Sequence, residues 1–356
     1  MEILFVFNED NTNGGASSIL RQVIDYYIAQ NSVVHIVFRK NKKYGHFDDI
    51  CCENLKLYYS KDLLHFIKNI WKVHKISFDY SFNSVVKFTG FVGVLKRLRL
   101  LHIKTMVGRE STSVFLRFKG LRLLYYKMWY QFGYKAVNVL ICQSNIMKEQ
   151  LIKNIPWIEK TARVVVIPNP VNLEKMNEMS MAVIDTSLYT PYIVTAGRMI
   201  PEKAYDVLLD AFSEINKEYS SLSLVILGDG MLRPQIENQI ERLKIKDKVI
   251  LAGQVSNVYP WFKQAKLCIV SSRMEGFPNV LLQMMSQNEK VVSTLCAGGI
   301  EKINGLFTCP INDSRALSHS ILECLESDTM GRRSLFDEEL NNRSIEKFIR
   351  IVEQSK

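Results

Sequence analysis

Short apolar runs alternate with longer amphipathic stretches along this chain, and the whole alternation occurs twice. The runs predicted as strands in the first half are 3–7, 33–38, 55–58, 104–107, 139–143 and 163–167. Those predicted in the second half are 192–196, 222–227, 249–252, 267–271, 290–293 and 305–309. Helix-period patterns lie between most of these runs. Such alternation indicates parallel sheets with crossover helices, and the near-continuous hydrophobicity of the strands indicates that both sheet faces are covered.

A proline-rich joint, Pro168-Asn169-Pro170, separates the two halves. The length of 356 residues suits two domains, and the 47% apolar content rules out disorder as the dominant state. We therefore expect two doubly wound α/β domains, at 1–170 and 171–330, with a cleft between them. We expect residues 331–356 to form a helix that packs back on the first domain. In such domains ligands bind beyond the carboxyl ends of the strands.

The sequence carries no signal for a membrane span, a metal site or a bound cofactor. No run approaches the roughly 18 apolar residues of a spanning helix, and Glu2 stands where a signal peptide would be basic, which predicts a cytosolic chain. The seven cysteines show no C-x-x-C pattern and are expected to be reduced. No D-x-D pair is present, so a metal-dependent mechanism is disfavoured.

The excess positive charge is concentrated in one segment. The whole chain has 46 basic and 36 acidic residues, a net charge of +10, and residues 96–135 hold ten Lys or Arg against the single acid Glu110, a net +9. Leucines and aromatic residues alternate with these charges, a mixture typical of contact with an anionic membrane surface. A solvated helix face over a buried core has the same composition, and both interpretations stay open. Nucleic acid is disfavoured, since no nucleic-acid-binding module accompanies the segment.

Several loops that directly follow predicted strands carry residue types that bind phosphate. Arg198 and Lys203 lie five positions apart after the strand at 192–196 and can converge on a diphosphate. After the first strand, Gly14 and Gly15 precede a helix, where backbone N–H groups can approach an anion. A solvated surface pair and a plain turn are the alternatives. The glycine pattern is not G-x-G-x-x-G, so a nicotinamide dinucleotide is not indicated.

The loop motifs of the second half, in their order and separations, resemble the GT4 family of retaining glycosyltransferases with the GT-B fold, of the type that builds bacterial surface polysaccharides. They are G-R-M-I-P-E-K at 197–203, L-G-D-G at 227–230, A-G-Q-V at 252–255, E-G-F-P-N-V-L-L at 275–282 and the linker V-I-P-N-P-V at 166–171. The resemblance is specific from 163 to about 310 and weak before Gly108. It implies two Rossmann-like domains facing across a cleft, and a nucleotide-sugar donor, with UDP-sugar as the first expectation.

The resemblance also implies roles for individual residues. Arg198 and Lys203 would hold the donor diphosphate and Glu275 the hydroxyls of the donor sugar, and these three are predicted to be catalytic. The other predicted donor-binding residues are Gly14, Gly15, Gly197, Val255, Gly276, Phe277, Pro278, Asn279, Val280 and Gln283. Of these, Val255 would contact the base through its main chain. Gln283 replaces the second acid of the family's E-x7-E pattern, and its amide can still accept a hydrogen bond from the ribose.

Three residues of the first half are candidates for the acceptor side. Arg109 and Glu110 follow the strand at 104–107 and resemble a polar site of the polysaccharide-building subgroups, although a structural ion pair would have the same sequence. Ser144 follows the strand at 139–143, where it is either a helix N-cap or part of an acceptor-facing loop.

We therefore expect a metal-independent hexosyltransferase that moves a sugar, with retention, from a nucleotide diphosphate to a hydroxyl of a growing glycan. The segment 96–135 favours a polyprenyl-diphosphate-linked acceptor and a peripheral location on the inner face of the cytoplasmic membrane. Two alternatives stay open. One is a nucleotide-sugar epimerase or hydrolase of the same fold, and the other is an inactive partner that binds nucleotide-sugar or glycan, for which Gln283 is the motivating feature.

Overall fold

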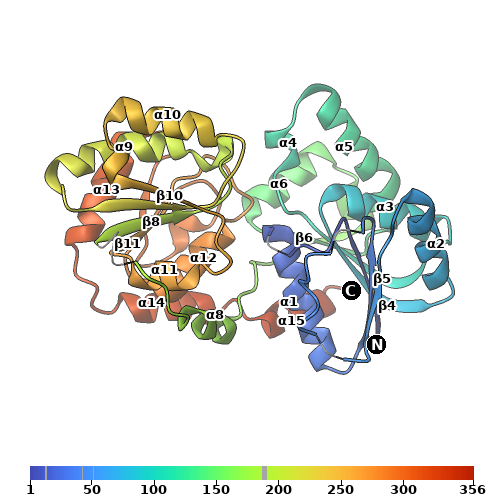
Figure 1. The fold of residues 1–356 in the computed structure, drawn as a ribbon. Coiled ribbons are helices and arrows are strands. Elements are labelled where there is room, and N and C mark those ends of the chain that lie inside the picture. Colours follow the sequence, from blue (N-terminus) through green and yellow to red (C-terminus); the bar gives the residue numbers. More distant parts are fainter. Residues whose placement is uncertain (13, 42, 51, 187–190) are drawn as a thin grey trace. The chain divides into compact units, whose positions relative to one another are not determined.

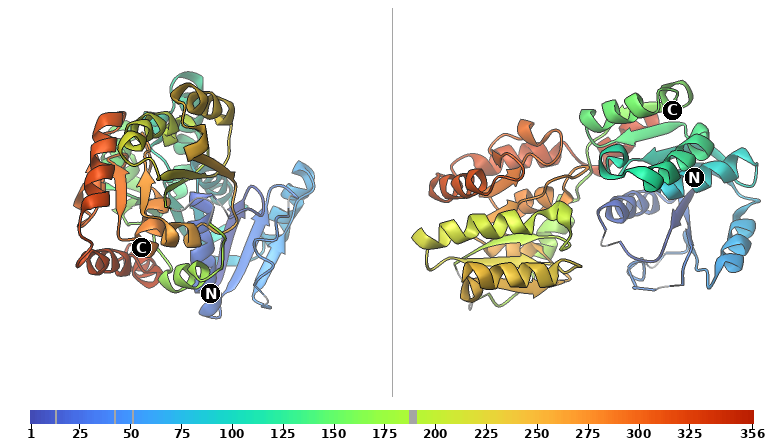
Figure 2. Two further views of the ribbon diagram at one scale, coloured as in Figure 1. Left: turned by 60° about the vertical axis from the view of Figure 1, so that its left-hand side comes forward. Right: turned by 90° about the horizontal axis from the view of Figure 1, so that it is seen from above.

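The computed structural model describes residues 1–12, 14–41, 43–50, 52–186 and 191–356, and the chain divides into two compact units. Unit 1 comprises Met1–Pro170 and Ser344–Lys356, and unit 2 comprises Val171–Arg343. Each unit is a sheet with helices on both faces (Figures 1 and 2). The prediction of two doubly wound parallel sheets is confirmed. Within the described residues, no helix is long and apolar enough to cross a bilayer.

The unit 1 sheet has seven parallel strands in the order β3-β2-β1-β4-β5-β6-β7. The strands are β1 Glu2–Phe7, β2 Val33–Phe38, β3 Leu55–Tyr58, β4 Ser77–Ser84, β5 His102–Arg109, β6 Val139–Cys142 and β7 Arg163–Val166. The strand order reverses between β1 and β4. In a doubly wound sheet, this reversal marks the edge where a ligand can enter between the loops.

Strand β4 is the one strand of unit 1 that the sequence pattern did not predict. Its sequence is SFDYSFNS, in which polar residues alternate with aromatic residues, although it lies between β1 and β5. The buried polar side chains Ser81, Asn83 and Ser84 find partners inside the sheet; Asn83, for example, donates to the Ser81 hydroxyl at 2.9 Å. These hydrogen bonds offset part of the cost of burying a polar strand in a central position, although Asn83 Oδ1 has no partner among the described residues.

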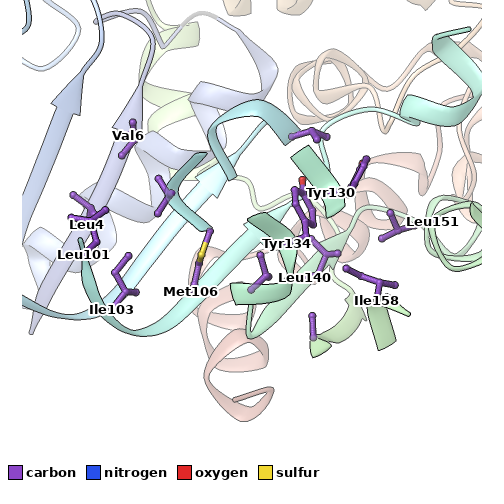
Figure 3. Packing of buried hydrophobic residues seen from close by; sticks show 14 of the residues in the cluster. Leu4, Val6, Leu101, Ile103, Met106, Tyr130, Tyr134, Leu140, Leu151 and Ile158 are labelled. Atoms are coloured by element: carbon purple, nitrogen blue, oxygen red, sulfur yellow. The ribbon is translucent and has the colours of Figure 1, made fainter. Parts of the chain in front are cut away.

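Helices cover both faces of the unit 1 sheet. They are α1 Gly15–Ala29, α2 Leu63–Val73, α3 Val86–Arg97, α4 Val114–Arg117, α5 Gly120–Gly133, α6 Asn145–Asn154, α7 Ile158–Thr161 and α15 Ile345–Gln354. On one face α1 and α15 pack around the buried Tyr27 and Phe348. On the other, α2, α3, α5 and α6 enclose the cluster of Figure 3, which includes Met106 and Leu140.

Unit 2 has six parallel strands in the order β10-β9-β8-β11-β12-β13. The strands are β8 Tyr192–Ala196, β9 Ser223–Leu227, β10 Val249–Gly253, β11 Leu267–Val270, β12 Val291–Thr294 and β13 Phe307–Cys309. The helices are α8 Leu173–Ser180, α9 Tyr205–Glu218, α10 Arg233–Leu243, α11 Tyr259–Gln264, α12 Asn279–Gln287, α13 Ser314–Glu326 and α14 Arg332–Asn341. The order reverses between β8 and β11. Residues 331–356, expected as one helix, form two, of which α14 belongs to unit 2 and α15 to unit 1.

Candidate active site

Lys203 and Glu275 meet at the carboxyl edge of the unit 2 sheet, where the strand order reverses. Lys203 ends the short 3₁₀ helix η2 (Pro201–Lys203) after β8, and Glu275 lies in the loop after β11. The Lys203 Nζ lies 2.7 Å from Glu275 Oε1, and Ser272 Oγ donates to the same oxygen at 3.0 Å. Their side chains are only 17% and 21% exposed. Two residues 72 positions apart therefore place opposite charges side by side in a partly desolvated site.

Glycines allow the loop after β8 to pass close to its neighbours. A Cβ on Gly197 would lie 2.9 Å from Lys203 Cε, so the lysine side chain crosses directly over this residue. A Cβ on Gly228 would lie 2.0 Å from the Gly197 carbonyl oxygen, and one on Gly230 would lie 2.6 Å from Met199 O. Backbone bonds join the same segments, since Met199 N–H donates to Asp229 O at 2.9 Å. The Gly-Asp-Gly turn after β9 thus supports the loop that carries Arg198 and Lys203.

The loop after β11 is bonded to the same lysine-bearing segment. Ser271 Oγ donates to Lys203 O at 2.8 Å, and Arg273 N–H donates to Glu202 O at 2.8 Å. The Arg273 guanidinium also pairs with Asp206, and this pairing lowers the Asp206 pKa although burial opposes it. The two loops therefore form one hydrogen-bonded substructure, which holds Lys203 and Glu275 together.

Helix α12 starts immediately after Glu275, Gly276, Phe277 and Pro278. Its first N–H groups have no side-chain cap, so this end of the helix presents donors and the positive end of the helix dipole. Phe277 is 7% exposed, and its ring lies 4.7 Å from the guanidinium carbon of Arg343. Backbone donors thus adjoin the acid at this edge, an arrangement suited to an anion beside a hydroxyl-rich group.

Gln283 lies one turn into α12 and faces α11. Its Nε2 donates to the Tyr259 hydroxyl at 3.2 Å, and burial raises the pKa of that hydroxyl. Val255 is half-buried and packs against the cluster that contains Tyr259. The structure therefore links Gln283 to a tyrosine that the sequence motifs did not single out, and it packs Val255 against the hydrophobic cluster to which this tyrosine belongs.

In unit 1, Arg109 and Glu110 are both buried, and within the described structure they do not form the structural ion pair that is the alternative to an acceptor-side role. The Glu110 carboxylate instead accepts hydrogen bonds from Tyr130 at 2.6 Å and Tyr134 at 2.7 Å. Burial raises the Glu110 pKa to about 7 and lowers the Arg109 pKa to about 10. Arg109 donates to Asn169, and its Nη1 lies 3.4 Å from Ser84 Oγ. Adjacent residues at a strand end point to opposite sides, which separates the two charges.

Ser144 caps helix α6, since its hydroxyl accepts from Met147 N–H at 3.3 Å. Gly14 and Gly15 are exposed at the start of α1, at the end of the loop that follows β1, and Gly14 is the N-cap residue. Asn13 beside them lies outside the described residues.

Arg198 is exposed, and in the part of the chain that the structure describes its guanidinium makes no ion pair. The ligand contacts expected of these residues stay predictions.

Two family models match the chain and together cover most of it. The model described as Glycosyltransferase Family 4 matches residues 13–175, and the one described as Glycosyl transferases group 1 matches residues 190–327. The chain belongs to glycosyltransferase family 4. The second model spans Arg198, Lys203, Glu275 and Gln283, so the residues that meet at the edge of the unit 2 sheet lie inside a glycosyltransferase domain.

Relatives of this family 4 protein include two Campylobacter jejuni enzymes. A GalNAc-diNAcBac-diphospho-undecaprenol N-acetylgalactosaminyltransferase is 26% identical over 48% of this chain and 45% of its own length. An α-1,4-N-acetylgalactosaminyltransferase named for a longer undecaprenol-linked glycan is 24% identical over 80% of this chain and 77% of its own. The chain thus spans less than half the length of the first. Anabaena HepE, solved with UDP and glucose, covers 99% of both chains with a TM-score of 0.79 at 16% identity, which shows the GT-B fold.

Proposed function

We propose that this protein is a retaining hexosyltransferase that moves a sugar from a nucleotide diphosphate to a hydroxyl of a glycan in bacterial surface polysaccharide biosynthesis. The observation that carries the proposal is the Lys203–Glu275 pair at the switch point of the unit 2 sheet, beside the start of α12. A cation, a carboxylate and the positive end of a helix dipole at one edge are the complement of a sugar joined to a diphosphate.

Each group has a distinct task in this proposal. Lys203 and Arg198 stabilise the negative charge that grows on the diphosphate as it leaves. Glu275, oriented by Ser272, accepts hydrogen bonds from donor sugar hydroxyls. Gln283 contacts the ribose, and Val255 contacts the base through its main chain, for which a UDP-sugar is the first choice. These protein cations and helix N–H groups carry the charge stabilisation, so we propose a reaction that needs no metal ion.

The bond changes follow from retention. The bond between the anomeric carbon and the diphosphate oxygen breaks, and the acceptor oxygen bonds to the same carbon on the same face. Because the acceptor attacks from the face that the diphosphate leaves, no protein nucleophile is required, and because the acceptor proton passes to the leaving diphosphate oxygen, no protein base is required. The chain contributes position and charge: Glu275 holds the sugar, and Lys203 and Arg198 hold the leaving group.

We propose a polyprenyl-diphosphate-linked glycan as the acceptor. The undecaprenol-linked glycans named for the two Campylobacter relatives support this choice. On the acceptor side, Arg109 contributes a buried positive charge at the carboxyl edge of the unit 1 sheet, held by Asn169 and Ser84. Such an acceptor places the enzyme at the inner face of the cytoplasmic membrane, a location that the basic segment 96–135 supports.

A donor screen tests the proposal. Thermal unfolding and turnover are measured with UDP-, GDP- and ADP-sugars for wild type, for Arg198→Ala with Lys203→Ala, and for a matched control, Arg242→Ala with Lys266→Ala. We expect one donor class to raise the unfolding temperature of wild type and control but not of the site variant. Turnover in EDTA should be unchanged. Absence of any donor effect would refute the site, and donor breakdown without acceptor would favour the epimerase or hydrolase.

A further inference from the structure

Two helices of unit 1 present apolar stripes to the outside. On α2, Leu63, Leu64, Ile67 and Trp71 are between 55% and 72% exposed. On α5, the exposed apolar residues are Leu121, Leu124, Tyr125, Met128 and Phe132, with Leu121 at 86%. Both sets recur at helical spacing, so each forms a continuous stripe along its helix. Figure 1 shows α2, α3 and α5 on one side of the unit 1 sheet.

The stripes are additional to the faces with which these helices bury the core. Phe66 and Ile70 of α2 and Tyr130 of α5 are buried in the cluster of Figure 3. Phe66 also contacts Phe91 of α3 at a ring distance of 5.5 Å, which links α2 to the α3–α5 pair. When the outer face of a helix is apolar as well as its inner face, the outer face is suited to contact with another apolar surface.

Within the segment 96–135 the exposed charge has one sign, whereas α2 begins beside the exposed acid Asp62. Eight of the ten basic residues in 96–135 are exposed, whereas the single acid, Glu110, is 2% exposed and bonded to two tyrosines. The outer surface of this segment therefore carries no acid to balance its cations. Arg117 and Arg122 are held over the same Phe118 ring, at 5.5 and 4.5 Å from its centre. Both guanidinium groups lie near one aromatic ring, a concentration of positive charge that suits a phosphate group.

A pocket of about 430 Å³ opens between the ends of α3 and α5, and its lining is mostly apolar. It is lined by Val94, Arg97, Leu98, Met128, Trp129 and Phe132. Arg97 donates to Phe132 O at 2.6 Å, which places a cation at an otherwise apolar opening. Both helices end here just before β5 and β6 begin, so the pocket lies near the amino edge of the sheet, away from its ligand edge.

We propose that the outer face of α2, α3 and α5 docks on an anionic phospholipid bilayer and that the pocket between α3 and α5 takes up one hydrocarbon chain of a lipid. The apolar stripes enter the interface, and the surrounding Arg and Lys side chains pair with lipid phosphates. The surface extends to α2, outside the segment 96–135, whereas Leu101 and Phe118 within that segment are buried. The proposal does not depend on sugar transfer.

Charge complementarity favours a bilayer over a protein partner. An acidic protein could pair with the cations, but it would have to match two separate stripes and an apolar pocket at once. A bilayer needs no such match, because its phosphates and chains adapt to the surface. Every charge carrier on the exposed face of 96–135 is basic, which a headgroup layer of uniform negative charge complements.

Co-sedimentation of the full chain with vesicles tests the docking surface. Vesicles of phosphatidylcholine alone are compared with vesicles containing about one third phosphatidylglycerol, at about 0.1 M and about 0.5 M NaCl. Three variants are used: Leu64→Ser with Leu121→Ser, Arg117→Gln with Arg122→Gln, and a control, Val183→Ser with Met330→Ser, whose residues are 97% and 90% exposed in unit 2. Each of the first two should bind anionic vesicles about tenfold more weakly, and the control should match wild type.

The pocket has its own readout. In a Trp71→Phe variant, Trp129 should be quenched by anionic vesicles whose acyl chains carry bromine, and the further change Met128→Glu should remove this quenching. The docking proposal would be overturned if wild type bound neutral vesicles as tightly as anionic ones. It would also be overturned if the control variant lost as much binding as the other two variants. Binding without quenching would overturn the chain site. If sedimentation showed a soluble dimer that buries the stripes, a second copy of the chain would occupy this face, and the docking proposal would again be overturned. Donor-induced stabilisation should be the same in all variants.

Discussion

Replacing Gly228 by alanine should damage the candidate active site far more than the same replacement at Gly253. The two glycines are hydrogen-bonded to each other, since Gly228 N–H donates to Gly253 O at 2.7 Å, and both have positive φ angles, +135° and +70°. They differ in their surroundings. A Cβ on Gly253 meets no described atom within 4 Å, whereas one on Gly228 lies 2.0 Å from Gly197 O and 2.8 Å from Gly197 C.

The magnitudes follow from these distances. Gly253→Ala should lower the free energy of unfolding by about 1 kcal/mol, the strain of an alanine at positive φ. Gly228→Ala carries similar strain and must also push the backbone of Gly197 away, which adds about 1–3 kcal/mol. Because Gly197 lies beneath the Lys203 side chain, the displaced loop should also separate Lys203 from Glu275.

Urea unfolding followed by circular dichroism measures the first effect, and calorimetric donor titration measures the second. We expect Gly253→Ala to bind donor like wild type and Gly228→Ala to lose at least tenfold in affinity. If Gly228→Ala fails to fold, Gly197→Ala takes its place, because the atoms nearest to its Cβ belong to the flexible Lys203 chain, with Cε at 2.9 Å. Equal midpoints and equal donor affinities for the alanine variants at 228 and 253 would refute the reasoning.

Three further predictions concern other groups. Arg343→Ala should remove the contact with Phe277 and raise the donor KM several-fold with little change in kcat, while Arg343→Lys should be intermediate; equal steady-state kinetics would contradict this. Gln283→Glu should keep the link to Tyr259 with the hydroxyl as donor and lower the donor KM about tenfold, and a raised KM would indicate a site adapted to glutamine. Glu110 has a pKa raised from 4.5 to about 7, so its contribution to stability is greatest below pH 4.5 and falls until about pH 7. Glu110→Gln should abolish that part of the decline, on the order of 3 kcal/mol, in unfolding measured across this range.

The sequence predicts the sheet architecture because its signals are local. Runs such as 33–38 and 192–196 are apolar on both faces, and they coincide with strands β2 and β8 of the structure. Polar strand β4 gives no such signal. Its place is decided by neighbours on both sides, because its backbone pairs with β1 and β5 only when the sheet is assembled.

The motifs also name most of the donor-site candidates, because glycines, a cation and an acid after strand ends are visible in order along the chain. They do not show that Lys203 reaches Glu275 or that Gln283 bonds to Tyr259, since those contacts join residues brought together by the fold. Arg109 and Glu110 illustrate the same limit. Adjacent opposite charges suggest a pair, yet a strand end directs them apart, and burial of Tyr130 and Tyr134 provides the partners of the acid.

The sequence alone shows that positive charge is concentrated in 96–135, but the exposure of each side chain decides which of these charges can bind a partner. Only the tertiary structure buries Glu110, turns Leu101 and Phe118 inward and places the exposed stripe of α2 in the same unit as that of α5. The order of residues thus determines which segments become strands and which loops carry charge, because these depend on neighbours along the chain. Which side chains share a surface or a site depends on packing between distant segments, and that is determined only when the sheets and helices assemble.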